Sequence, residues 1–165
     1  MKKRSIYILI ASLLMLGIMA VMLIVFLGKA KEDFPDSITV SENGVTESVM
    51  TVRDLKLNPT ESKEYSINLV CEASGSYYVT LDYEEKADGG MKPFVDVTVK
   101  LDGQVIYEGQ LLSLLDGDEL IGFEAELHRK NPVKISVVYT MPYEVGNEAQ
   151  GTYSDFDIII TIEKS

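Results

Sequence analysis

The chain has 165 residues, 46% of them hydrophobic, and carries 15 basic against 26 acidic residues for a formal net charge of -11. This length suits one domain and the apolar content is enough to build a core, so wholesale disorder is excluded. The acidic balance excludes nucleic acid as a partner, because so acidic a chain is repelled by a phosphate backbone. With one His and one Cys, the chain offers neither an ordinary zinc site nor an internal disulfide.

The chain begins with three basic residues and a long apolar run. Lys2–Arg4 precede an uncharged stretch, residues 5–28, that is dominated by Leu, Ile, Val and Met. At about 1.5 Å per residue, a helix of this length crosses a hydrocarbon core of about 30 Å. We therefore expect residues 1–28 to form a single-pass anchor in the plasma membrane, with the basic end in the cytoplasm and the rest of the chain outside. A cleaved signal peptide, which would release a secreted protein, is the alternative.

Apolar and polar residues alternate with a period of two through residues 37–165, after a short charged linker at residues 29–36. Half-buried strands produce this pattern, and one buried and one wet face is typical of antiparallel sheets. We therefore expect an all-β domain of eight or nine strands, an antiparallel β-sandwich with jelly-roll or Greek-key connections. A closed barrel is the alternative. The predicted inner faces begin at Tyr65, Tyr77, Val95, Ile121, Val133 and Phe156.

Turn-forming residues separate the predicted strands. Asp102-Gly103 suits a two-residue hairpin, because Gly accepts a positive φ. Leu111–Leu115 and Val145–Gly151 are predicted to form short helical turns. The last predicted strand, Asp155–Lys164, contains three consecutive isoleucines. Because an exposed apolar edge is a pairing hazard, this strand is expected to be either central in a sheet or covered by a partner.

Few residues in the chain suggest chemistry. Cys71 shares a predicted inner face with Tyr65, so we expect a buried thiol rather than a nucleophile. Asp116, Asp118 and Glu119 could supply oxygen ligands to Ca²⁺, the one cofactor that the sequence suggests, although a solvated acidic turn is the simpler interpretation. The chain shows no catalytic pair, no metal-ligand motif and no phosphate-binding loop, so we predict that it is not an enzyme.

The segment from Tyr139 to Phe156 contains an Asn-x-x-Gln-Gly turn made by Asn147, Gln150 and Gly151, and an apolar strand follows it. This segment resembles the C-terminal part of the camelysin/TasA group of exported bacterial proteins. The resemblance implies a jelly-roll sandwich behind an N-terminal export segment, and some members of that group assemble into biofilm matrix fibres. Camelysin is described as a metalloprotease, an activity that we do not transfer to a chain without a recognisable metal-ligand set.

Together these features predict a membrane-anchored, non-enzymatic protein of cell-envelope assembly, adhesion or matrix interaction. Its partner is expected to be another protein or a second copy of itself, bound by strand addition or face packing near the C-terminus. A ligand-binding or sensing module that uses Ca²⁺ at Asp116–Glu119 is one alternative, and a surface hydrolase is another. The expected contact residues are Asn147, Gln150, Gly151, Phe156, Ile158 and Ile160.

Overall fold

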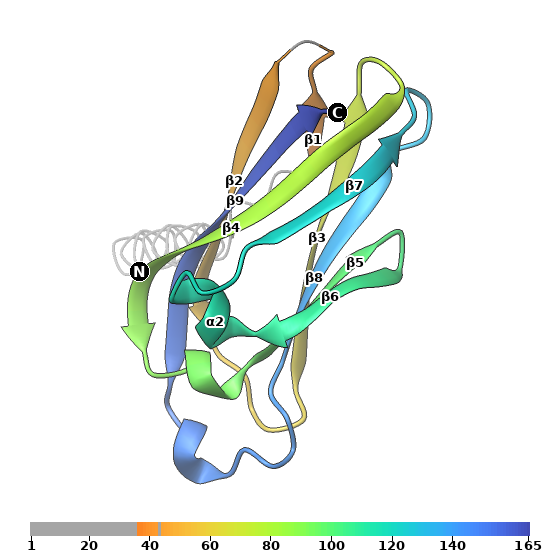
Figure 1. Cartoon of the computed structure of the whole chain (residues 1–165). Coiled ribbons are helices and arrows are strands. Elements are labelled where there is room, and N and C mark those ends of the chain that lie inside the picture. The colour runs from red at the N-terminus through yellow and green to blue at the C-terminus, as the bar shows by residue number, and fades with distance from the viewer. Residues whose placement is uncertain (1–35, 43) are drawn as a thin grey trace, which may run out of the picture. The chain divides into compact units, whose positions relative to one another are not determined.

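Residues 36–42 and 44–165 are described by a computed structural model, in which nine strands form two sheets (Figure 1). The strand order is β1-β3-β8-β5-β6 in the five-stranded sheet and β2-β9-β4-β7 in the four-stranded sheet. The predicted all-β architecture is confirmed, as two separate sheets rather than one closed barrel. The strands are β1 (Ser37–Val40), β2 (Val45–Leu55), β3 (Ser62–Cys71), β4 (Gly75–Gly89), β5 (Asp96–Leu101), β6 (Gln104–Gln110), β7 (Ile121–Leu127), β8 (Val133–Thr140) and β9 (Tyr153–Lys164).

The core lies between the two inner faces that the alternation predicted. From Tyr65 to Cys71 and from Tyr77 to Tyr83, every second side chain is at most 6% exposed. Cys71 is therefore a buried thiol, as expected. Phe123 and Leu101 are only partly buried, because β7 is an edge strand and Leu101 ends β5 at a hairpin. Full burial of a large apolar side chain contributes about 1.5–3 kcal/mol, so this core is the main source of stability.

The final strand lies inside its sheet. β9 pairs with β2 on one side and with β4 on the other, so both of its edges are hydrogen-bonded. Phe156, Ile158 and Ile160 are 0% exposed. The prediction that Asp155–Lys164 offers a contact strand is therefore wrong, because its backbone groups are used within the sheet and its apolar side chains fill the core. The sequence had left two positions open for this strand, central in a sheet or covered by a partner, and in the structure the strand is central.

The connections include one departure from the antiparallel pattern. β1 pairs in parallel with β3, from Ser37 opposite Asn68 to Val40 opposite Cys71, and forms an edge of the five-stranded sheet. The other strand pairs are antiparallel. The predicted hairpin joins β5 to β6, with φ of 48° at Asp102 and 84° at Gly103, as a type I′ turn requires.

Three short helices lie between the strands of the described part: η1 (Lys92–Phe94), α2 (Leu111–Leu115) and η2 (Asn147–Ala149). Leu111 and Leu114 of α2 are buried, so this predicted turn adds its apolar side chains to the core. η2 lies within the second predicted helical turn, where Ala149 is buried.

The predicted anchor at residues 1–28 and most of the predicted linker lie outside the described residues. Within residues 36–42 and 44–165, no helix combines the length and the apolar character that a membrane crossing requires.

Candidate functional site

Two loops that are distant in the sequence border a groove of about 360 Å³. One loop joins β2 to β3 and contributes Lys56–Glu61, whereas the other joins β8 to β9 and contributes Gly146–Thr152. Both loops lie at the same end of the sandwich, at the bottom of Figure 1. The second loop contains the turn residues Asn147, Gln150 and Gly151 that the sequence pattern had singled out.

The β2–β3 loop is fixed by its own hydrogen bonds and by Met141, the residue that follows β8. The Asn58 backbone N–H and side-chain amide both donate to the Glu61 carboxylate, each at 2.9 Å. The Thr60 N–H donates to the Met141 carbonyl at 2.8 Å, and the Met141 N–H donates to the Glu61 carbonyl at 3.0 Å. Leu57 is buried in the core, so this wall of the groove is anchored from both sides.

The β8–β9 loop is equally well defined. The Gln150 N–H donates to the Asn147 carbonyl at 3.1 Å, and the Thr152 hydroxyl donates to the Ala149 carbonyl at 2.7 Å. Gly151 has φ of 79°, a left-handed conformation that costs glycine little and other residues more. The glycine therefore allows the chain to leave η2 and enter β9 at once.

The groove offers hydrogen-bonding groups but no reactive pair. Asn147 and Gln150 are exposed, and no other residue of the described part bonds to their side-chain amides. Lys56 pairs with Asp54 at 2.6 Å and adds a positive charge at the rim. The lining contains no Ser, Cys or His, so it lacks an ordinary nucleophile–base pair. Such a surface can bind a partner through its amides.

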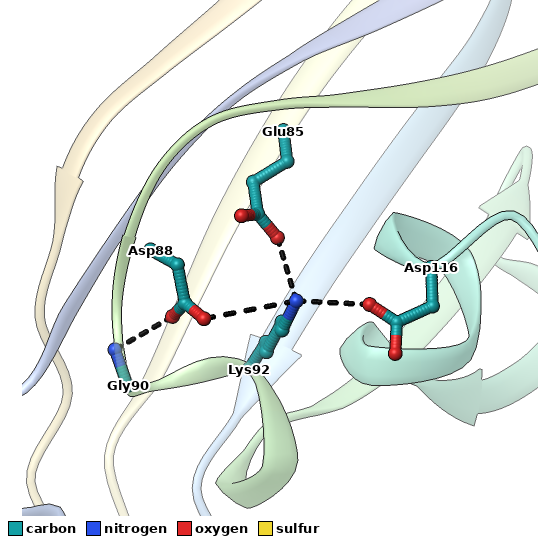
Figure 2. Close-up of polar contacts among 5 residues, drawn as sticks. All are labelled: Glu85, Asp88, Gly90, Lys92 and Asp116. Atoms are coloured by element: carbon teal, nitrogen blue, oxygen red, sulfur yellow. Dashed lines mark hydrogen bonds and ion pairs between the residues drawn. The ribbon is translucent and has the colours of Figure 1, made fainter.

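A second polar cluster involves one of the predicted calcium ligands. The Lys92 ammonium lies 2.9 Å from Asp116, 2.7 Å from Glu85 and 3.7 Å from Asp88 (Figure 2). Its hydrogen bonds to Asp116 and then to Glu85 raise the pKa of Lys92 well above the usual value. The lysine therefore stays charged at physiological pH and connects η1, the end of β4 and the residue that follows α2.

The other two predicted calcium ligands face different partners. The Glu119 carboxylate accepts a hydrogen bond from the Tyr107 hydroxyl, and the Asp118 N–H donates to the Ser113 carbonyl at 3.0 Å. No group of three or more His, Cys, Asp or Glu side chains in residues 36–42 and 44–165 is placed to hold a metal ion. The structure therefore does not bring Asp116, Asp118 and Glu119 together around one position.

The charged side chains on the outer face of the four-stranded sheet are mostly acidic. Strand alternation with the buried positions directs them to solvent. The basic residues Arg53 and Lys86 lie near Asp157, at 3.8 Å and 3.3 Å respectively, and compensate only part of the charge. This face repels anionic surfaces. Its acidic residues are Glu47, Asp82, Glu84, Glu124, Glu126, Asp155, Asp157 and Glu163.

Comparison with known proteins gives distant structural likenesses. No family model and no curated protein sequence matches the chain. The C-terminal domain of EclA, described as a sugar-binding protein, aligns with a TM-score of 0.36 and 14% identity over 81% of this chain and 86% of that one. A β-glucosidase from Paenibacillus barengoltzii aligns with a TM-score of 0.34 and 12% identity over 80% of this chain.

The insecticidal delta-endotoxin Cry8Ea1 from Bacillus thuringiensis aligns with a TM-score of 0.36 and 13% identity, over 71% of this chain. The alignments cover only 12% of the glucosidase chain and 19% of the toxin chain. At these scores and identities, the likenesses carry no argument about function.

Proposed function

We propose that this protein is a non-enzymatic, extracytoplasmic binding protein that acts in cell-envelope assembly, adhesion or matrix interaction. Its partner, another protein, binds in the groove between Lys56–Glu61 and Gly146–Thr152. One observation carries the proposal: Asn147 and Gln150 lie on a loop held by internal hydrogen bonds and line the groove with amides that no other described residue engages. Side-chain amides carry both donors and acceptors and therefore suit the backbone of a bound polypeptide.

We propose further that the domain is a jelly roll of the camelysin/TasA-like kind. The order β2-β9-β4-β7 facing β3-β8-β5-β6 supports this topology, because each sheet alternates strands from the two halves of the chain, as interleaved Greek keys do. The Asn147–Gly151 turn before the last strand supports the likeness to that group.

We also propose that residues 1–28 anchor the domain in the plasma membrane, with residues 5–28 in the bilayer and the domain outside the cell. The support is the apolar run behind three basic residues. Mass spectrometry of the mature N-terminus tests this proposal. A chain that retains residues 1–28 agrees with the anchor, whereas a chain that begins after residue 28 would identify a cleaved signal and a secreted protein.

The groove is tested by site-specific photo-crosslinking in intact cells. A photoreactive residue at position 150 is expected to give one defined adduct with another protein, and Asn147→Ala is expected to reduce the yield of that adduct. The matched control places the same group at Gln104, an exposed position at the start of β6, where no adduct is expected. The absence of an adduct at position 150, or equal labelling at both positions, would contradict a binding site in the groove.

A further inference from the structure

Strand β2 is a long sheet edge with little protection against pairing. One of its sides bonds to β9, and no other described strand pairs with the second side. Its register with β9 runs unbroken from Val45 to Val52, and a bulge follows at Arg53 and Asp54. The unbroken stretch contains neither Pro nor Lys, the residues that commonly protect such edges.

The remaining edges in the described part are less suited to pairing. β1 has only four residues. The β5–β6 pairing is interrupted by a register shift between Val99 and Lys100, which distorts β6. β7 carries Glu124 and Glu126, and the like charges of two such strands would repel each other. β2 is therefore the edge on which another strand fits best.

The outer face of β2 is also unusually apolar for an edge. Val45 and Val49 are 59% and 45% exposed, and Val49 lies beside the half-buried Ile159 of β9. A strand added to β2 would cover part of this apolar surface and would use the free backbone groups of the edge.

We infer that β2 pairs with β2 of a second copy of this chain, antiparallel and about a two-fold axis, so that two four-stranded sheets become one. In such a pair, a residue on the outer face of one copy must lie opposite a residue on the outer face of the other copy. Only a few registers of the two strands satisfy this condition. The register centred on Met50 places Glu47 of each copy opposite Arg53 of the other and Val49 opposite Thr51.

The charges of β2 select this register among its neighbours. Glu47 is exposed and has no ion pair within the described residues, and the side chain of Arg53 is 51% exposed with a single long contact to Asp157 at 3.8 Å. By symmetry, the pairing therefore creates two cross-strand ion pairs. The bulge begins at Arg53, so β2 is regular from Val45 to Val52, and the two Glu47–Arg53 pairs lie at the ends of the paired stretch. This interface is separate from the groove and does not depend on it.

The test is the self-association of the full chain in detergent solution, measured by sedimentation equilibrium. The wild-type chain is expected to form a dimer. Glu47→Arg creates repulsion at both ends of the pairing and is expected to weaken the dimer by about tenfold or more. The double variant Glu47→Arg/Arg53→Glu restores opposite charges and is expected to restore the dimer. Glu144→Arg, which makes the same change of charge at an exposed position of the β8–β9 loop, is expected to have no effect.

A wild-type chain that stays monomeric, or a dimer that Glu47→Arg leaves unchanged, would overturn the inference. Failure of the double variant to restore a dimer would reject this register. If a charge variant does not fold, disulfide crosslinking tests the same register. In a Cys71→Ala background, chains with Val49→Cys mixed with chains with Thr51→Cys are expected to form disulfide-linked heterodimers in preference to either homodimer, and random linkage would exclude the register.

Discussion

Tyr139 and Phe156 pack edge to face with ring centroids 5.4 Å apart, and this contact joins the two sheets, because Tyr139 lies on β8 and Phe156 on β9. Tyr83 of β4 also belongs to this cluster. Its ring lies 5.7 Å from that of Phe156, and its hydroxyl lies 3.3 Å from the Tyr139 hydroxyl. Both hydroxyls are buried in the core, where each is the other's hydrogen-bond partner.

Removing both hydroxyls of this pair is expected to cost less stability than the sum of the two single removals. Tyr139→Phe leaves the buried Tyr83 hydroxyl without a partner, which is expected to lower the free energy of unfolding by about 1–3 kcal/mol. The double variant Tyr83→Phe/Tyr139→Phe leaves no buried donor unpaired, so its loss is expected to be smaller than the sum of the single losses. Urea unfolding of the four proteins in this double-mutant cycle measures the difference. Strictly additive losses would show that the two hydroxyls are not coupled.

The same pair predicts a loss of stability at alkaline pH. Burial raises the pKa of Tyr83 and of Tyr139 above the usual value, whereas an unfolded tyrosine titrates near about 10. Because the folded pKa is the higher one, this contribution to stability is complete below about pH 10 and is lost as the pH rises above it. Unfolding as a function of pH, followed by tyrosinate absorbance, should show the fall. In the Tyr83→Phe/Tyr139→Phe variant, stability should fall less steeply with rising pH. An equally steep fall would show that these two tyrosines are not its cause.

Lys92→Met is expected to destabilise the domain. The substitution leaves Glu85, Asp88 and Asp116 close together without the cation that lies between them. These carboxylates are 30–44% exposed, so solvent screens part of their repulsion, and a loss of about 1–2 kcal/mol is expected. Thermal unfolding at low and high salt measures the effect, which salt should reduce.

The matched control is Lys56→Met, which removes a lysine whose ion pair with Asp54 is exposed on both sides, at 58% and 63%. Exposed ion pairs contribute little to the stability of the folded state, so no measurable change in unfolding temperature is expected. Equal effects of the two substitutions would show that the contacts of Lys92 have no structural role.

Ser154→Ala is expected to leave the stability unchanged or to raise it by up to about 1 kcal/mol. Ser154 is 0% exposed, and its hydroxyl has no hydrogen-bond partner within the described residues. The substitution therefore removes a buried polar atom whose desolvation no hydrogen bond offsets. Ser136→Ala is the control, because Ser136 is also buried but hydrogen-bonds the Glu64 carboxylate. The control is expected to be destabilising in chemical denaturation, and a clear loss of stability in Ser154→Ala would contradict the unpaired hydroxyl.

Calcium at millimolar concentration is expected to leave the unfolding temperature unchanged. Asp116 is held by Lys92 and Glu119 by Tyr107, so the acidic turn would have to give up both contacts to coordinate an ion. A calorimetric scan with Ca²⁺ and a second scan with a chelator measure any shift. A rise with Ca²⁺ that the chelator reverses would support the ligand-binding alternative instead.

The sequence predicted the inner faces well because burial on one side of a strand leaves a local signal. The run from Tyr77 to Tyr83 shows this signal clearly. The alternation gives no signal where local geometry breaks it: β4 continues to Gly89 through a register shift between Glu85 and Ala87. Near the start of β2, the inward positions are occupied by the polar residues Thr46 and Ser48. The sequence of this strand therefore does not alternate between apolar and polar residues.

The candidate groove could be predicted only in part. Asn147, Gln150 and Gly151 are recognisable from one continuous segment. The opposite wall, Lys56–Glu61, is brought to the same end of the sandwich by the pairing of β3 with β8, and no local pattern encodes that pairing. For the same reason, the sequence left two positions open for β9 and gave no indication that Lys92 would meet Asp116.

The parallel strand β1 determines how the domain would respond to force. The chain that precedes residue 36 leads directly into β1, which is held to β3 at four register positions. A pull on that chain would therefore load this short pairing first, before the long strands of the opposite sheet. Resistance to such a pull is set first by a four-residue strand, however stable the core behind it.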